Sequence, residues 1–162
     1  IRIGCGVATT MFLTRDNMVL VTGKRATGLC VIGGLGSSMV THLSVGDGFA
    51  LARTNQSDIV VSKCRKRFEL VEELRNVYPT GVSAGLGHYA LVTEEGGAMA
   101  CGYNAYGQVG AGEMGLTIEG GLDARMIRPH RVALTLVAIP EGFRARSVAA
   151  GAFHTLYLLS PP

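Results

Sequence analysis

Short apolar runs that alternate with polar or glycine-rich turns make up most of this chain. The clearest pair spans 88–93 and 98–101, two mostly apolar stretches joined by a Glu-Glu-Gly-Gly turn. Such stretches joined by a short turn with glycine are typical of a β-hairpin, because glycine tolerates a positive φ. Similar hairpin patterns occur at 10–22 and 49–62, so the sequence predicts three hairpins of short strands.

The hairpins belong to a repeating unit whose landmarks keep a constant spacing. Each unit opens on a glycine, at Gly6, Gly46, Gly85 and Gly151. In the first and third units a second glycine, Gly23 or Gly102, follows 17 residues after the first. Units of about 40 residues with several short strands are typical of β-propeller blades. The predicted units span about 1–45, 46–84, 85–150 and 151–162, the last of them incomplete.

The predicted fold class is therefore all-β, a single partial β-propeller of about three to four blades of short antiparallel strands.

One segment fits two interpretations. Apolar residues at steps of three and four in 68–77 indicate an amphipathic helix, whereas the repeat register makes the segment the outer strand and turn before Val82. We expect the strand and turn, because a helix would leave that blade one strand short.

The third unit also carries family-specific residues. The stretches Val-Ser-Ala-Gly-Leu-Gly-His at 82–88 and Cys-Gly-Tyr-Asn-Ala-Tyr-Gly-Gln-Val-Gly at 101–110 resemble the regulator of chromosome condensation repeat. The segment 148–156 resembles the opening of another such repeat, whereas Thr9 and Phe49 replace the histidine in the first two units. The structural repeat positions are Gly6, Gly23, Gly46, Gly85, His88, Gly102, Asn104, Gly107, Gln108, Gly151 and His154.

This resemblance implies a seven-bladed propeller of four-stranded blades, for which 162 residues are too few. An unclosed ring leaves two sheet edges with unpaired backbone groups. The chain also begins and ends inside predicted strands. We therefore expect it to be a piece of a longer polypeptide, or the ordered part of one, and to be embedded among neighbours in an assembly.

Composition narrows the choice of function. The chain is 48% hydrophobic and only 17% charged, yet it has no apolar run long enough to span a bilayer as a helix. The net charge of +3 is small for a chain that neutralises nucleic acid along its length. One basic patch stands out, at Lys63, Arg65, Lys66 and Arg67. This patch fits a contact to RNA, DNA or an acidic partner, or a nuclear localisation signal. It fits a solvated loop equally well.

The four cysteines, Cys5, Cys30, Cys64 and Cys101, lie far apart and none has metal-ligand spacing. We expect reduced, buried thiols and hence an intracellular protein, with cytoplasm, nucleus and mitochondrion all open.

The sequence predicts no catalytic residue, cofactor or metal. The glycine-rich stretches 1–9 and 85–90 imitate a dinucleotide-binding loop, but strand-like runs follow both and no acidic residue stands 20 positions later. His88 and His154 occupy equivalent positions in different units, so they cannot converge on one ligand. We expect their rings to bond backbone groups within their own blades.

The step from Gly85 to Gly151 is 66 residues, and the excess over the other steps lies between Gly112 and Pro129. Long loops on a propeller face often contact partners, although a disordered excursion is the alternative. The predicted partner-contact loop comprises Glu113, Met114, Leu116, Ile118, Asp123, Arg125 and Arg128.

Two functions follow. The first is a non-catalytic protein-interaction platform or structural subunit of a larger assembly, for example a ribonucleoprotein or cytoskeletal complex. The alternative is guanine nucleotide exchange on a small GTPase, which the founding member of the resembled family performs on the Ran GTPase. Exchange requires no acid–base residues, so the absence of predicted catalytic groups does not decide between them.

Overall fold

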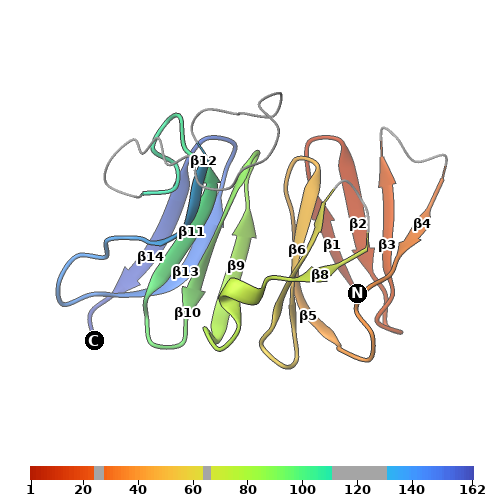
Figure 1. Cartoon of the computed structure of the whole chain (residues 1–162), viewed down its shortest axis with the longest axis horizontal. Helices are drawn as coiled ribbons and strands as arrows, with labels where there is room; N and C mark the ends of the chain where they lie inside the picture. Colours follow the sequence, from red (N-terminus) through yellow and green to blue (C-terminus); the bar gives the residue numbers. More distant parts are fainter. Residues whose placement is uncertain (24–27, 64–66, 111–130) are drawn as a thin grey trace.

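The computed structural model describes residues 1–23, 28–63, 67–110 and 131–162, and shows a row of antiparallel sheets (Figure 1). The first sheet contains β1 (Arg2–Cys5), β2 (Thr9–Leu13), β3 (Val19–Gly23) and β4 (Cys30–Ile32). The second contains β5 (Val40–Val45), β6 (Phe49–Thr54), β7 (Ile59–Lys63) and β8 (Glu69–Leu70). The third contains β9 (Pro79–Ala84), β10 (His88–Thr93), β11 (Ala98–Tyr103) and β12 (Arg131–Leu136). A hairpin of β13 (Arg144–Ala150) and β14 (Thr155–Ser160) follows.

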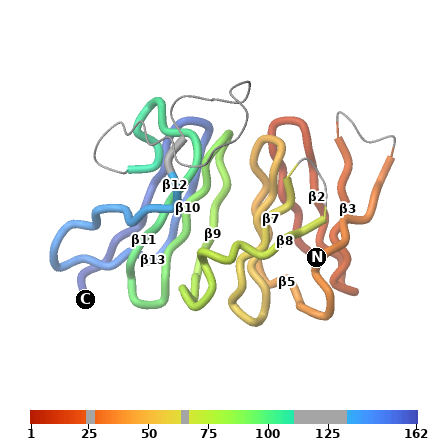
Figure 2. The backbone as a smooth tube through the Cα atoms, in the orientation of Figure 1, coloured from red at the N-terminus to blue at the C-terminus, as the bar shows by residue number. Residues whose placement is uncertain are grey.

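Within each sheet the strands pair in chain order, so each sheet is an antiparallel meander. Successive sheets meet through their first strands, β1 against β5, β5 against β9 and β9 against β13. The tube in Figure 2 shows the same side-by-side order from the first sheet to the last. Three four-stranded blades and the opening hairpin of a fourth confirm the predicted partial β-propeller.

The ambiguous segment 68–77 follows the repeat register rather than the helical pattern. Its outer strand is the two-residue β8, which pairs with β7. A single 3-10 turn, η1 (Glu72–Leu74), then leads toward β9. Leu74 of this turn is fully buried between the second and third blades, which accounts for the helix-like spacing of the apolar residues.

The hydrophobic core lies between blades rather than within them. Alternate residues of a strand point to opposite faces of its sheet, so each blade offers one apolar row to each neighbour. Met11 and Leu13 of β2 pack with Val45 of the second blade. Leu91 of β10 packs with Leu51 of the second blade. Each interface therefore requires two blades.

The opening glycines of the four units form a continuous line through the blades. A Cβ on Gly6 would collide with the carbonyl oxygen of Gly46, and one on Gly46 with that of Gly85. A Cβ on Gly85 would in turn collide with the carbonyl oxygen of Gly151. The backbones approach too closely for any side chain, which explains why the register of these glycines determines how the blades pack.

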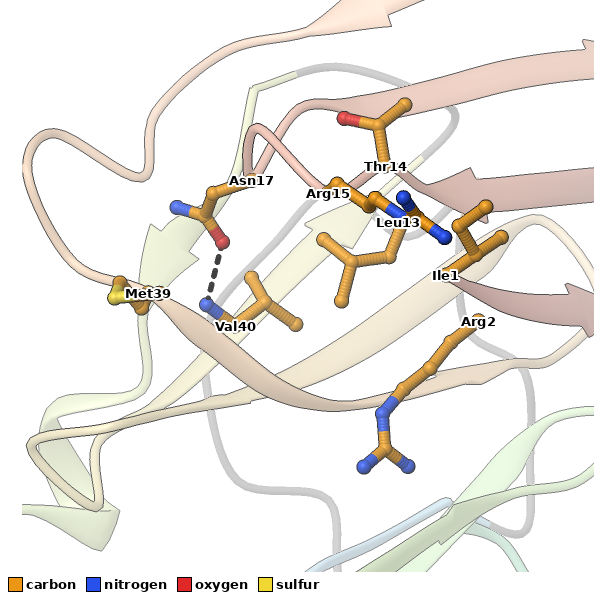
Figure 3. A pocket seen from close by; sticks show the side chains of 8 residues that line it. All are labelled: Ile1, Arg2, Leu13, Thr14, Arg15, Asn17, Met39 and Val40. Carbon is orange, nitrogen blue, oxygen red and sulfur yellow. Dashed lines mark hydrogen bonds between the residues drawn. The ribbon is translucent and has the colours of Figure 1, made fainter.

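Side chains tie neighbouring blades together with a different set of hydrogen bonds at each joint. Between the first two blades, the Asn17 side chain donates to the Ser38 carbonyl oxygen and accepts from the Val40 amide, both at 2.8 Å. Figure 3 shows the second of these bonds at the wall of a cavity of about 490 Å³.

The next two joints use serine hydroxyls of the first strands. The Ser44 hydroxyl accepts from the Ala84 amide, and the Ser83 hydroxyl accepts from the Ala150 amide, each at 2.9 Å. The equivalent residue in the first blade is Gly4, which has no hydroxyl to offer. Arg53 additionally donates to the carbonyl oxygens of Pro79 and Thr80 across the second joint.

The two outer flanks of the row differ from the joints, because apolar side chains there are exposed. Ile3 of β1 and Leu156 and Leu158 of β14 occupy positions of the kind that are covered by a neighbouring blade elsewhere. Within the described part of the chain, no helix has the length and apolar character needed to cross a membrane.

Candidate interaction face

The blades present two ends to solvent. One end, here called the repeat-glycine face, carries the β1–β2, β5–β6, β9–β10 and β13–β14 turns, and lies uppermost in Figure 1. The strands β3, β7 and β11 also end there, since each pairs antiparallel with its preceding strand. The opposite end, here called the connection face, carries the hairpin turns after β2, β6 and β10 and the connections from one blade to the next.

The basic patch is at the repeat-glycine face as far as the structure describes it. Lys63 ends β7 and Arg67 precedes β8, and both side chains are exposed. Arg65 and Lys66 lie outside the described residues, as do all members of the predicted partner-contact loop, Glu113, Met114, Leu116, Ile118, Asp123, Arg125 and Arg128.

A tight loop after β11 is built by the family-specific residues of the third unit. The buried Asn104 side chain accepts a hydrogen bond from the Val109 amide at 2.8 Å. The buried Gln108 side chain accepts one from the Tyr106 amide at 2.9 Å. Gly107 has a φ of 76°, a left-handed conformation that favours glycine. Together these residues fix a turn that holds Tyr106 outward.

Three aromatic rings cluster on this face, of which two are exposed and one, Tyr103, is half-buried. Tyr106 is 68% exposed and its ring centroid lies 5.1 Å from that of Phe153, which is 45% exposed. Tyr103 lies edge-on to Tyr106 at 6.3 Å. Edge-to-face pairs at such distances are favourable, so the rings support one another's positions. We call Tyr103, Tyr106 and Phe153 the aromatic cluster.

Sequence reasoning did not single out Tyr106 or Phe153, although both are aromatic residues in turns of well-kept units. Phe153 follows Gly151 in the β13–β14 turn, 47 residues after Tyr106. The signal that could have indicated both residues is a large aromatic side chain in a turn, where no core is available to cover it.

Below the cluster, His88 joins the third blade to the fourth. The Thr155 hydroxyl donates to the Gln108 carbonyl oxygen at 2.7 Å, and therefore accepts from Nε2–H of His88 at 2.9 Å. The prediction of backbone bonding within its own blade is thus wrong for Nε2, whose partner is a side chain 67 residues away. His154, the equivalent residue, is exposed, because no further blade covers it in the described chain.

Burial lowers the pKa of His88 below its ordinary value of 6.5. The unfolded chain then binds a proton more readily than the folded chain, so this contribution to stability is present above pH 6.5 and is lost below it. Lowering the pH from 7 to 5 should decrease the free energy of unfolding, by at most about 1.4 kcal/mol per pH unit from this group.

Urea unfolding at pH 5, 6 and 7 measures this effect. The matched variant is His88→Phe, because Phe49 already places a ring against the repeat glycine in the second blade. The variant should have a flatter pH dependence. His42 contributes to what remains, because its pKa is also lowered by burial and by Arg53 and Arg2. A variant with the full pH dependence of the wild type would contradict the assignment.

The cysteine prediction is wrong in part. Cys5, Cys30 and Cys101 lie in strands, but Cys5 and Cys30 are exposed. Cys5 faces the uncovered flank of the first blade, and Cys30 is on an outer strand. Cys64 lies outside the described residues. Among the residues that the structure describes, no three His, Cys, Asp or Glu side chains form a group that could hold a metal ion.

Radial antiparallel meanders that meet through a line of glycines define this protein as part of a β-propeller. Residues 80–108 match the family model of the regulator of chromosome condensation (RCC1) repeat. The chain thus carries this repeat and has the fold of part of a propeller of that type. A search of curated protein sequences gave no match.

Solved propellers agree with this assignment of the fold. The chain matches Prp20p from Saccharomyces cerevisiae with a TM-score of 0.79 and 14% identity, covering 99% of this chain and 44% of Prp20p. It matches human WBSCR16 with a TM-score of 0.76 and 14% identity, over 99% of this chain and 44% of that protein. Yeast Prp20 in its structure with Kap60 gives a TM-score of 0.74 and 18% identity, over 98% and 41%. The chain therefore spans less than half the length of these structures.

Proposed function

We propose that this protein is a non-catalytic interaction platform within a larger intracellular assembly, and that a partner protein docks on its repeat-glycine face. The observation that carries the proposal is the aromatic cluster. Exposed aromatic residues are enriched at the centres of protein interfaces, where one or two of them supply much of the binding free energy. Here buried side chains of Asn104 and Gln108 hold Tyr106 in place before any partner arrives.

The neighbouring basic residues suit such a surface. Lys63 and Arg67 are exposed on the adjacent blade, so a partner that covers the cluster and carries carboxylates or phosphates on its rim would find cations there. Rim charges of this kind change the rate of association more than the affinity. The same basic residues could also contact the phosphates of RNA or DNA.

The test is affinity purification of the protein, identification of the stoichiometric partner, and measurement of its binding with purified components. Tyr106→Ala should weaken that binding by about 2 kcal/mol or more, the range of an interface hot spot. Phe143→Ala is the matched control, because Phe143 is also an exposed aromatic residue but lies in the β12–β13 connection and lines neither docking surface. Equal affinities of the wild type and Tyr106→Ala would contradict docking at the cluster.

Guanine nucleotide exchange is the second candidate. The crystal structure of Prp20p was described together with its binding to Gsp1p and histones, and the present chain has the fold of part of that propeller. A nucleotide-release assay against a panel of small GTPases separates the two functions. Stimulated nucleotide release would mean that the protein is an exchange factor rather than a non-catalytic platform. A stoichiometric complex without stimulated release supports the platform.

A further inference from the structure

A groove on the connection face is separate from the aromatic cluster. It has a volume of about 760 Å³ and lies where the connection from η1 to β9 meets the β10–β11 turn and the end of β12. Its principal lining residues are Val77, Tyr78, Glu94, Glu95, Met99 and Leu136. All of them belong to the described chain, and none takes part in the proposed docking of a partner on the repeat-glycine face.

The floor and one rim of the groove are apolar. Val77 and Met99 are half-buried and pack on the hydrophobic cluster between the second and third blades. Leu136, at the end of β12, is 72% exposed, and Tyr78 is 56% exposed. These two side chains extend the apolar floor of the groove to its rim.

The other rim is acidic. Glu94 and Glu95 are exposed in the β10–β11 turn, and no lysine, arginine or histidine is among the residues that line the groove. Neither carboxylate takes part in a salt bridge with a described residue. The salt bridge in the neighbouring η1 segment joins Arg75 to Glu72. The groove therefore combines an apolar floor with two carboxylates on its rim. Arg144 packs on Gly96 of the same turn but forms no ion pair with either carboxylate.

The walls are fixed before anything binds. The Glu94 amide donates to the Tyr78 carbonyl oxygen at 3.1 Å, which joins the two sides of the groove. The turn itself is closed by the Gly97 amide, which donates to the Thr93 hydroxyl at 3.1 Å. Tyr78 has a φ of 50°, unusual for a bulky residue, so the surrounding contacts hold it in this position. A preformed wall reduces the entropy cost of binding.

We propose that this groove binds an extended segment of a partner protein in which a lysine or arginine side chain lies next to an aliphatic one. The cation pairs with Glu94 and Glu95 and can lie over the ring of Tyr78, which attracts cations electrostatically. The aliphatic side chain covers Val77, Met99 and Leu136. Charge complementarity selects this occupant, because the two carboxylates repel phosphates of nucleic acids and anionic lipids. The groove would give the platform a second docking surface on its opposite face.

The test uses fluorescence anisotropy with a labelled ten-residue peptide of alternating arginine and leucine, and the same peptide with glutamate in place of arginine. The 162-residue chain should bind the basic peptide saturably and should not bind the acidic one. The double variant Glu94→Gln with Glu95→Gln should bind about tenfold more weakly, as two charge pairs at a partly covered surface are lost. Leu136→Ser should weaken binding about fivefold through lost apolar contact.

Glu141→Gln is the matched control, because Glu141 is an exposed carboxylate in the connection after β12 but does not line the groove. It should bind the peptide as the wild type does. Circular dichroism spectra verify that the variants keep the strand content of the wild type. Absence of saturable binding, unchanged binding by the Glu94 and Glu95 variant, or an equal loss in Glu141→Gln would each overturn the proposal. Tyr106→Ala should leave peptide binding unchanged, so failure of the groove and failure of the aromatic cluster are distinguishable.

Discussion

Gly85→Ala is expected to destabilise this protein by about 3 kcal/mol or more, since overpacking against backbone cannot be relieved by a rotamer change. The added Cβ would meet the Gly151 carbonyl oxygen on one side and the His88 ring on the other. Relief requires the third and fourth blades to separate, which would also break the bond between His88 and Thr155. Small domains have only about 5–15 kcal/mol of stability, so the loss is a large fraction.

Urea denaturation followed by circular dichroism measures the change. Gly33→Ala is the matched control, because a Cβ there has open space around it and the backbone does not require a positive φ. Its effect should stay within about 0.5 kcal/mol, as for other surface substitutions. If Gly85→Ala were as stable as Gly33→Ala, close contact of the blades through the repeat glycines would be wrong.

Leu91→Ala should have the second largest effect, a loss of about 2–5 kcal/mol, because a fully buried leucine leaves a cavity. Leu91 is completely inaccessible and packs with Leu51, Ile59 and Leu74 between the second and third blades. In the described part of the chain the hydrophobic core lies at such interfaces, so one cavity weakens the attachment of a whole blade.

Leu156→Ala provides the comparison within the same chain. Leu156 occupies the strand that corresponds to β10 in the fourth blade, but it is 65% exposed. Its truncation should cost less than about 1 kcal/mol, since little apolar area is lost from a buried state. A similar loss in both variants would mean that Leu156 is covered in solution by another blade or by a second molecule, and that the exposed flank described above is closed.

Much of the fold was predictable because it depends on local rules. The spacing of Gly6, Gly46, Gly85 and Gly151 fixes the blade register, and turn residues fix the hairpins within each unit. The same register correctly outweighed the helical pattern at 68–77. The short β8 and the η1 turn satisfy both the repeat register and the helical spacing of apolar residues, because one turn of 3-10 helix suffices to bury Leu74.

The features that were not predictable depend on contacts between units. His88 bonds to Thr155 only because the fourth blade docks beside the third, and its spacing from Thr155 carries no sequence signal. The aromatic cluster likewise requires two turns from different blades to meet. Exposure of Cys5 follows from which flank of the row is uncovered, which hydrophobicity alone does not reveal.

The hydrogen bonds between neighbouring blades differ from joint to joint, which limits how the blades of this chain can be rearranged. Asn17 serves the first joint, Ser44 with Arg53 the second, and Ser83 the third, so only the serine bond is repeated between joints. A chimera that exchanges the second and third blades would retain every strand, every opening glycine and the serine–amide bond, which is the same at both joints. It would, however, bring Pro79, which has no amide hydrogen, to the place where the Val40 amide donates to Asn17. The exchange should therefore weaken the first joint, so the order of the first two blades depends on side chains as well as on the repeated backbone.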